Sequence, residues 1–395
     1  MSHKLIPAIA SAASLLVALP SAAWEQTPSG LTLNAGYTLQ TDDNLFRFPS
    51  TVAARSERIG ISTLGVGFNT TQSLQKIEAR VSLVDYKYNN FDYLSFTARN
   101  YDVAWRWAFT PRWTGNLTSD RRETLNSFAD YQNINQRNQR VDANLRLDTI
   151  YELSGPWRLI AGAARTRQEN QQAVLGDGDY TLTSGDAGLR YVFGSGSAVS
   201  YSAKAINGSY PNRVLSAANL SDNSFHQLDN DLRLRWVLNG NSTVDANLTH
   251  LSRSYTNFGQ RDYSGFATGA GVNWVLSGKT SVSAAYAHEL GAYTTSTSNY
   301  SATDRISLGT QWQMSAKSVL QLRHTWAQAD FLGNPGPSQT LARRDTNRDT
   351  SLSVLWAPQQ QITLNAGLQQ VARSSNQPNL DFAALMATLS AQFTY

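Results

Sequence analysis

Residues 384–395, ALMATLSAQFTY, place an apolar side chain at every second position. Successive side chains of a β-strand point to opposite faces of the sheet, so this segment would have one apolar and one mostly polar face. Chain ends usually fray unless another part of the protein holds them. The pattern therefore predicts a final strand that is firmly paired with a neighbour. The apolar set is Leu385, Ala387, Leu389, Ala391, Phe393 and Tyr395.

The same two-residue period recurs along the whole sequence. An amphipathic helix repeats about every 3.6 residues and would mix apolar and polar side chains on both faces, whereas a strand separates them. We therefore expect an all-β chain. Five clear examples are residues 31–39, 101–109, 141–148, 231–238 and 361–369.

Two kinds of connection alternate between these segments. Eight are short and rich in Gly, Pro, Asn and Ser, as hairpin turns are, and nine are longer and more polar. Together they join eighteen strands, or sixteen if one hairpin is divided wrongly. Short turns at one end and long loops at the other are typical of outer-membrane barrels, which have an even strand number. The short turns lie at 69–73, 110–113, 153–157, 194–197, 238–242, 276–280, 314–318 and 357–361, and the long loops at 40–57, 88–98, 122–138, 169–179, 207–224, 255–263, 293–302, 331–343 and 372–381.

The predicted fold is thus an all-β, transmembrane outer-membrane barrel of about eighteen antiparallel strands, in which residues 381–395 pair with residues 31–40. Closure satisfies the backbone hydrogen bonds that lipid cannot supply. Phe393 and Tyr395 would complete this closure, and a terminal aromatic residue resembles the signal that the bacterial barrel-assembly machinery recognises. Tryptophans beside the short turns agree with an interfacial girdle. A soluble sandwich or propeller explains neither these tryptophans nor a second face that is almost never apolar.

Residues 1–23 have the features of a secretory signal, with a positive charge, an apolar stretch and small residues before a cleavage point after Ala23. A membrane helix is the alternative, but the apolar run is short and is interrupted by Pro7 and Pro20. We therefore expect residues 24–395 to form a single barrel in the outer membrane of a Gram-negative bacterium, with both termini in the periplasm.

A barrel of this size leaves a water-filled lumen unless something plugs it. The first strand begins near Leu31, which leaves no plug domain, and no loop is long or apolar enough to be chosen as a constriction. Many arginines occupy the alternate strand positions that face the lumen. They either pair with acidic neighbours and stiffen the wall, or present guanidinium groups to carboxylate- or sulfate-bearing substrates. The arginines predicted to line the substrate path are Arg80, Arg106, Arg146, Arg190, Arg233, Arg235, Arg305 and Arg323.

Catalysis finds little support in the sequence. Cysteine is absent, which excludes thiol chemistry and disulfides. No G-x-S-x-G motif occurs, and three of the five histidines, His250, His288 and His324, fall on the lipid-facing parity of separate strands. We expect no enzymatic activity, no metal and no cofactor. Nucleic acid is not a sensible partner for an exported barrel.

One short motif follows the first strand. The segment TDDNLFRFP at 41–49 has the composition of a loop, in which polar residues end the strand and Pro49 stops its return. Together with the signal, the barrel and the chain length, it resembles the EpsL-type outer-membrane proteins that accompany exopolysaccharide synthesis and exosortase systems. The resemblance implies a polysaccharide export barrel, supplied by a separate periplasmic protein because this chain has no helical-repeat domain. The residues that carry it are Asp42, Asp43, Asn44, Leu45, Phe46 and Arg47.

Two functions remain after these exclusions. The first is an outer-membrane pore that secretes an extracellular polysaccharide. The alternative is an uptake porin for small solutes, anionic ones included, or for oligosaccharides. A purely structural or adhesive barrel is a third hypothesis. In each case the outer surface would contact membrane lipid and lipopolysaccharide.

Overall fold

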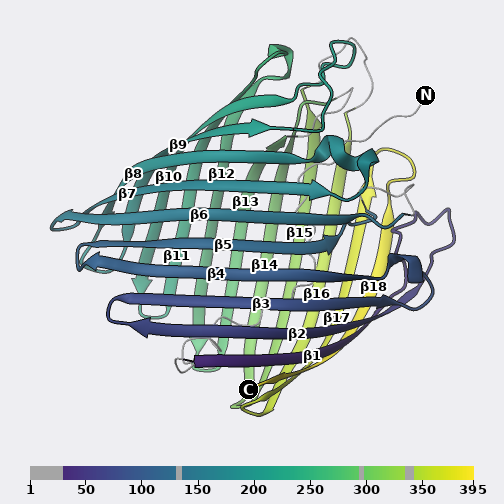
Figure 1. The fold of residues 1–395 in the computed structure, drawn as a ribbon, viewed down its shortest axis with the longest axis horizontal. Helices are drawn as coiled ribbons and strands as arrows, with labels where there is room; N and C mark the ends of the chain where they lie inside the picture. Colours follow the sequence, from purple (N-terminus) through teal and green to yellow (C-terminus); the bar gives the residue numbers. More distant parts are fainter. Residues whose placement is uncertain (1–29, 130–135, 293–297, 334–341) are drawn as a thin grey trace.

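The computed structural model describes residues 30–395 except 130–135, 293–297 and 334–341. The predicted signal peptide therefore lies outside the described residues. The described chain forms one closed sheet of eighteen antiparallel strands (Figure 1), as the sequence predicts. In order, the strands are β1 (Gly30–Asp42), β2 (Glu57–Gln72), β3 (Gln75–Tyr88), β4 (Phe96–Thr110), β5 (Trp113–Leu125), β6 (Gln139–Ser154), β7 (Trp157–Asn170), β8 (Tyr180–Val192), β9 (Ala198–Ser209), β10 (Ser224–Asn239), β11 (Ser242–Tyr255), β12 (Tyr263–Ser277), β13 (Thr280–Ala292), β14 (Tyr300–Ser315), β15 (Ser318–Leu332), β16 (Arg344–Gln359), β17 (Ile362–Ser375) and β18 (Phe382–Thr394).

The barrel closes where the first and last strands meet. β1 pairs with both β2 and β18, and its register with β18 runs from Asn34 opposite Thr394 to Asp42 opposite Met386. Backbone hydrogen bonds join Leu33 and Tyr395 in both directions, at 2.7 and 2.8 Å. The predicted pairing of the terminal segments is confirmed, and this seam holds the last strand as far as Tyr395.

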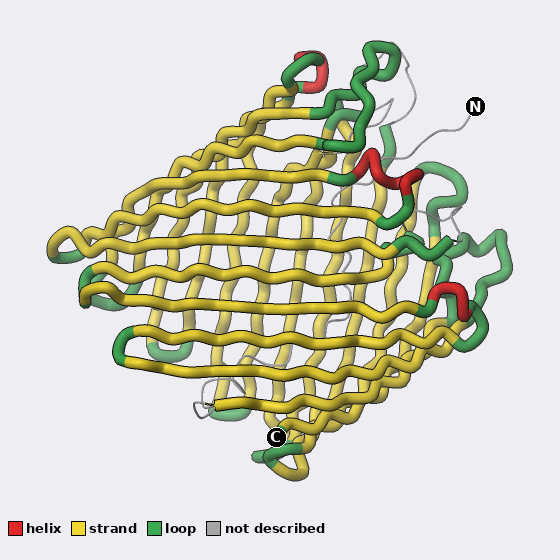
Figure 2. Tube along the Cα trace, in the orientation of Figure 1, coloured by secondary structure: helices red, strands yellow, loops and turns green. Residues whose placement is uncertain are grey.

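Short turns gather at one end of the barrel and longer loops at the other (Figure 2). We call these the turn end and the loop end. The strands, 12 to 16 residues long, continue further than their apolar segments, so several connections are shorter than predicted. Three short 3₁₀ helices lie in the loops, η2 (Asp92–Leu94), η3 (Ala173–Gly178) and η4 (Gly259–Arg261). No helix in the described ranges is long and apolar enough to cross a membrane.

The outer surface is apolar along most strands. Leu31, Leu64 and Leu389 are each more than 60% exposed, as expected for side chains that lie against lipid rather than in a core. Six tryptophans form an exposed girdle near the turn end, and the sequence predicted each of them: Trp113, Trp157, Trp236, Trp274, Trp312 and Trp356.

One further member of the predicted girdle is covered. Trp107 is buried beneath its neighbours Phe109 and Trp113, whose ring centroids lie 4.3 and 5.7 Å away. A Cβ atom on Gly115, the residue opposite Trp107, would come within 2.3 Å of the indole. The absence of a side chain at Gly115 therefore creates the space that the indole fills.

The inner surface differs from the prediction in its loop half. The sequence suggested that the lumen parity is almost never apolar, but apolar side chains cover it near the loop end. They occur where loops fold back onto the strands, so they bury against loop residues and not against lipid. The inward-facing apolar residues there include Ile59, Val84, Tyr88, Phe96, Phe225, Leu251, Tyr255 and Tyr263.

Candidate functional site: the lumen and its loop end

The strand register places all eight predicted arginines on the lumen side, on the parity opposite to the exposed apolar residues. Six of them lie on one arc of the wall, between β3 and β10: Arg80, Arg106, Arg146, Arg190, Arg233 and Arg235. Arg305 on β14 and Arg323 on β15 are separate from this arc. The arginines thus form a charged wall on one side of the lumen and not a ring.

Most of these arginines are engaged with acidic neighbours. Five make ion pairs, several between side chains on adjacent strands: Arg106 with Glu78, Arg146 with Asp148 at 2.5 Å and Asp186 at 3.4 Å, Arg233 with Asp231, Arg235 with Asp245 at 3.7 Å, and Arg305 with Glu289 at 3.2 Å. Arg190 and Arg323 have no ion pair among the described residues. The wall is therefore largely cross-linked, and these two guanidinium groups remain available to a passing anion.

The opposite wall is polar but almost uncharged. Between β16 and β2, hydroxyl and amide side chains cover the middle of the lumen face. The one carboxylate there, Asp349, accepts hydrogen bonds from the Gln369 amide at 2.9 Å to both of its oxygens. A solute in the lumen would therefore meet ion pairs on one side and neutral hydrogen-bonding groups on the other. Members of the neutral wall are Thr32, Asn34, Thr38, Thr63, Ser351, Ser353, Asn365, Gln369, Thr388, Ser390 and Gln392.

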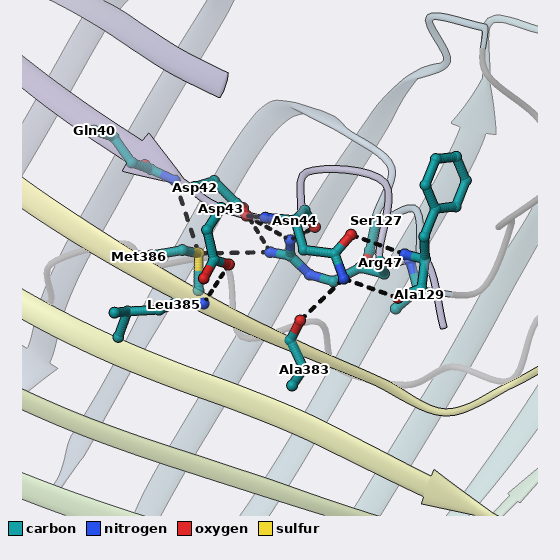
Figure 3. A network of polar contacts seen from close by, with 11 residues as sticks. Gln40, Asp42, Asp43, Asn44, Arg47, Ser127, Ala129, Ala383, Leu385 and Met386 are labelled. Atoms are coloured by element: carbon teal, nitrogen blue, oxygen red, sulfur yellow. Dashed lines mark hydrogen bonds and ion pairs between the residues drawn. The ribbon is translucent and has the colours of Figure 1, made fainter. Parts of the chain in front are cut away.

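The 41–49 motif fastens the loop end of the barrel seam (Figure 3). The backbone amide of Leu385 on β18 donates to Asp43 Oδ1 at 2.7 Å. Asn44 Nδ2 donates to the carbonyl of Ala383, also on β18, at 2.9 Å. The polar residues of the motif therefore join the first strand to the last one across the seam, and we call this network the seam clasp.

A buried ion pair shapes the motif itself. Arg47 contacts both carboxylate oxygens of Asp42 at 2.8 Å, and its guanidinium also lies 3.5 Å from the sulfur of Met386. Asn44 receives a hydrogen bond from the backbone of Phe48 at 2.9 Å and returns one to the Phe48 carbonyl. These contacts hold Arg47 at a positive φ of 56°, a conformation uncommon for non-glycine residues.

The same motif sends an aromatic side chain into the lumen. Phe46 is only 1% exposed and its ring lies 4.8 Å from both Phe91 and Phe128 and 5.6 Å from Phe48. These rings come from three different loops and rest on the inward apolar residues of β2, β3 and β4. We call this set the Phe46 cluster. It fixes the loops to the inner wall, so they do not project away from the barrel.

The loop after β5 reaches across the lumen. Phe128 packs in the Phe46 cluster, and the carbonyl of the next residue, Ala129, accepts a 2.7 Å hydrogen bond from Arg373 on β17. Five strands lie between β5 and β17 on that side of the barrel. Arg373 also donates to the carbonyl of Leu380 at 2.7 Å. The sequence did not single out any loop as a constriction, and the structure places the loop after β5 over part of the lumen.

A second group of loops closes against β8–β14. Arg261 in η4 is 2% exposed and donates to the carbonyls of Asn219, Leu220 and Ser298 at 2.8 to 3.1 Å. This one guanidinium thus ties together the loops that follow β9, β11 and β13. Burial lowers the pKa of Arg261, but an arginine starts so high that the group stays charged.

The carboxylate of Asp222 also fixes this group of loops, because it accepts several hydrogen bonds. Burial alone would raise the pKa of its carboxyl, but hydrogen bonds from Asn257, Phe258 and Ser224 outweigh burial and hold the pKa below its usual value. Two of these bonds, from the backbone amides of Asn257 and Phe258, are 2.6 and 3.0 Å long. The loop before β10 is therefore held most firmly when Asp222 is ionised.

The strand histidines lie away from the lumen, as the parity predicts. His288 contacts Asp304 at 2.9 Å on the outer surface, where Tyr286 also donates to Asp304 at 2.6 Å. His250 packs on Phe266, which is itself on the lipid-facing side. The histidines therefore do not meet in a common site with the lumen arginines.

The strand pattern does not identify the residues that hold the loops at the loop end, above all Phe128, Asp222, Arg261 and Arg373. One signal for them was present: Phe46, Phe48, Phe91 and Phe128 are aromatic side chains within predicted polar loops. Exposed loops rarely carry so many large apolar groups, so these positions indicated that the loops fold inward.

A closed eighteen-stranded barrel with an apolar outer surface and a charged, polar lumen defines the class: this is an outer-membrane β-barrel. Its fold is similar to that of OccK1 (OpdK) of Pseudomonas aeruginosa, with a TM-score of 0.53 over 92% of this chain and 99% of that chain at 10% identity. A structure of P. aeruginosa OpdK with vanillate gives 0.52 over 92% and 99% at 10% identity. OpdQ of the same bacterium gives 0.51 over 93% and 97%, also at 10%. At these identities the likeness shows the fold alone.

No family model matches the chain, and no curated protein matches its sequence. The similarity to EpsL-type proteins therefore stays a prediction. The structure gives the motif that carries this resemblance a physical role, because its polar residues form the seam clasp and its central phenylalanine anchors the Phe46 cluster.

Proposed function

We propose that the protein is an outer-membrane channel for the uptake of small hydrophilic solutes, with a preference for anions. The observation that carries this proposal is the loop segment Phe128–Ala129, fastened to Arg373 on β17, six of the eighteen strand positions away round the barrel. A segment that crosses this part of the loop end limits what can pass. Small molecules can go around it, whereas a thick polymer would need the segment to leave. The main hypothesis from the sequence, polysaccharide secretion, is therefore less well supported than its alternative.

The preference for anions rests on the charged wall. Arg190 and Arg323 have no acidic partner among the described residues, and the paired arginines still offer hydrogen-bond donors. An exposed ion pair is worth only about 0–1 kcal/mol, so each arginine would hold a solute weakly and release it to the next. Vanillate, with which an OpdK structure was determined, is a suitable small carboxylate for testing this preference.

The orientation is part of the same proposal. Barrels of this class carry short turns on the periplasmic side and long loops outside the cell. We place the loop end outside and both termini in the periplasm, inserted by the barrel-assembly machinery. The narrowed mouth would then be the first part that an external solute meets. The activity is transport and not catalysis.

Polysaccharide secretion remains the second candidate because of the neutral wall. Hydroxyl and amide side chains between β16 and β2 suit a chain of sugar hydroxyl groups, which exchange hydrogen bonds without a charge. The similarity of the 41–49 motif to EpsL-type proteins favours the same function. Secretion would require a separate periplasmic protein to deliver the polymer, and it would require Ala129 to leave Arg373.

Uptake into liposomes distinguishes the two candidates. Purified protein is reconstituted, and permeation is followed for a small carboxylate, a neutral monosaccharide and a series of longer neutral oligosaccharides. The proposal predicts fast permeation of the carboxylate, slower permeation of the monosaccharide and a sharp fall with chain length. The variant Arg373→Gln should weaken that size limit, and Arg323→Gln, a lumen arginine away from the loop end, should not. Permeation of long oligosaccharides at the monosaccharide rate by the unaltered protein would overturn the proposal and favour secretion.

A further inference from the structure

Four arginines on the neighbouring strands β4, β5 and β7 lie on the lipid-facing side of the barrel in its loop half. The register puts Arg121 on the same outward row as Tyr101, Ala143 and Arg167. Arg99 lies two residues nearer the loop end on β4, and Arg165 lies two residues nearer the turn end on β7. We call Arg99, Arg121, Arg165 and Arg167 the arginine belt.

The slant of the sheet brings the belt to one height in the membrane. A row of directly paired residues can be followed from strand to strand. The row that starts at Trp113, the first residue of β5, reaches Gln328 on β15, which lies ten positions beyond Ser318, the first residue of that strand. Such a row therefore moves towards the loop end by ten residues over ten strands, or one residue per strand. Between β4 and β7, a line at constant height in the membrane therefore moves three residues towards the turn end relative to the paired row. Relative to the same row, Arg165 lies four residues nearer the turn end than Arg99, so the two arginines lie at nearly the same height.

The charges of the belt are only partly neutralised. Arg121 pairs with Glu123 at 2.5 Å, and Arg167 pairs with Glu169. The side chains of Arg99 and Arg165 are exposed and make no ion pair with any described residue. The belt therefore keeps two guanidinium groups that the protein itself leaves without an acidic partner.

Arginines on the outer surface of a barrel are costly unless they meet anions. A lipid-facing arginine costs about 2–4 kcal/mol at the bilayer centre and about 0–1 kcal/mol near the interface. The belt stands at the polar edge of the apolar band, because Leu145 and Leu147 on β6 border it from the turn side. Headgroups lie at that height, and the guanidinium fork matches phosphate oxygens in pairs.

The belt is also local. Over β8–β12 the outward positions in the loop half carry uncharged or weakly basic side chains. These include Thr181, Thr183, Asn207, His226 and Ser252. Other outward basic residues of the loop half are Arg58 on β2, Lys87 on β3, and Arg344 and Arg348 on β16; Lys87 and Arg344 pair with Asp85 and Asp330. The arginine belt is therefore the densest group of outward arginines and not part of a uniform ring, and a dense group favours one bound molecule over general contact with headgroups.

We propose that the arginine belt is a binding site for the phosphorylated headgroup of lipopolysaccharide in the outer leaflet. This rests on the proposed orientation, which places the loop end outside the cell. Arg121 and Arg167 are two strands apart, or about 10 Å between backbones. A ligand that engages the whole belt must therefore carry more than one phosphate. The lipid A headgroup has two phosphates, whereas a common phospholipid has one.

The test measures lipopolysaccharide retained by the folded barrel. The double variant Arg99→Gln/Arg165→Gln and the control Arg348→Gln are purified from outer membranes in mild detergent, and bound lipid is quantified by native mass spectrometry. Arg348 is a suitable control because it is also exposed and lipid-facing, on β16, where it stands alone between Trp326 and Ala372. The double variant should retain roughly tenfold less lipopolysaccharide, since it loses hydrogen bonds to charged groups. The control should match the unaltered protein.

Added lipids complete the design. Delipidated barrel is offered lipid A, dephosphorylated lipid A or phosphatidylglycerol, and its thermal unfolding is followed. Stabilisation by lipid A alone supports the site. Equal stabilisation by dephosphorylated lipid A would show that only acyl chains bind, and equal stabilisation by phosphatidylglycerol would show a general headgroup contact; each result overturns the proposal. Solute permeation measured on the same variants is independent of lipid retention, so failure of the site and failure of the channel proposal are distinguishable.

Discussion

The substitution Phe46→Ala should release the loops that narrow the channel. The Phe46 ring is 1% exposed and contacts three other rings from the loops. Truncating a buried phenylalanine to alanine costs about 3–5 kcal/mol. Each 1.4 kcal/mol is a tenfold change in an equilibrium constant, so the open-to-closed ratio of these loops should rise by roughly 10² to 10³ or more.

The barrel itself should remain intact in this variant. Phe46 lies beyond the end of β1, and the strand pairs of the seam do not depend on its ring. Single-channel recording in a planar bilayer should show a larger and noisier conductance, and limited proteolysis should cut the loops faster. The heat needed to unfold the barrel in detergent should change much less.

Tyr93→Ala provides the matched control. Tyr93 lies in the same group of loops, but its side chain is 46% exposed and its ring is 6.3 Å from Phe91. We expect its conductance to equal that of the unaltered protein. If Phe46→Ala and Tyr93→Ala give the same conductance and the same cleavage rate, the Phe46 cluster does not hold the loops over the lumen.

Four further predictions concern the seam, the lumen and the loops. Deleting Phe393–Tyr395, or the change Phe393→Asp, removes the backbone bonds to Leu33 or puts a charge on the lipid face, so the amount of heat-modifiable barrel should fall; normal amounts would refute this. Asn44→Ala removes the bond to Ala383 and should lower the unfolding temperature of the barrel more than Asn90→Ala, an exposed loop asparagine. Arg146→Gln alone should change ion selectivity little, because each exposed ion pair is worth about 0–1 kcal/mol. Joint replacement of five arginines should shift the reversal potential towards cation preference: Arg106, Arg146, Arg190, Arg233 and Arg235. An unchanged reversal potential would exclude the charged wall as the selectivity element. The pKa of Asp222 is depressed in the fold, so the stabilisation that its carboxylate gives is present above the ordinary pKa of about 3.9 and is lost as the pH falls through the lower folded pKa. Amide exchange at Asn257 and Phe258 should therefore accelerate in acid. Asp222→Asn should remove that pH dependence.

The strand pattern could be predicted from the sequence because its causes are local. Alternation along residues 384–395 and the short turns depend on neighbouring residues, and they were enough to give the strand number and the pairing of the two ends. The lumen parity of the eight arginines followed from the same alternation. Their ion pairs followed only in part, because cross-strand partners depend on register, as in the contact of Arg146 with Asp186.

The narrowed loop end could not be predicted in the same way. Its contacts join residues far apart in the sequence, such as Arg373 with Ala129 and Asn44 with Ala383. No local pattern specifies such a contact, since a loop residue gains its partner only after the barrel has closed. The aromatic residues Phe46 and Phe128 in otherwise polar loops indicate that these loops fold inward. They do not indicate the strands to which the loops attach.

The size of molecule that enters the pore tests the central claim most directly. Single-channel conductance is measured in a planar bilayer while neutral polyethylene glycols of increasing length are added on the loop side. A channel narrowed by the Phe128–Ala129 segment predicts that only the shortest polymers enter and reduce the conductance, and that Arg373→Gln admits longer ones. Entry of long polymers into the unaltered protein, with no difference in the variant, would contradict the account.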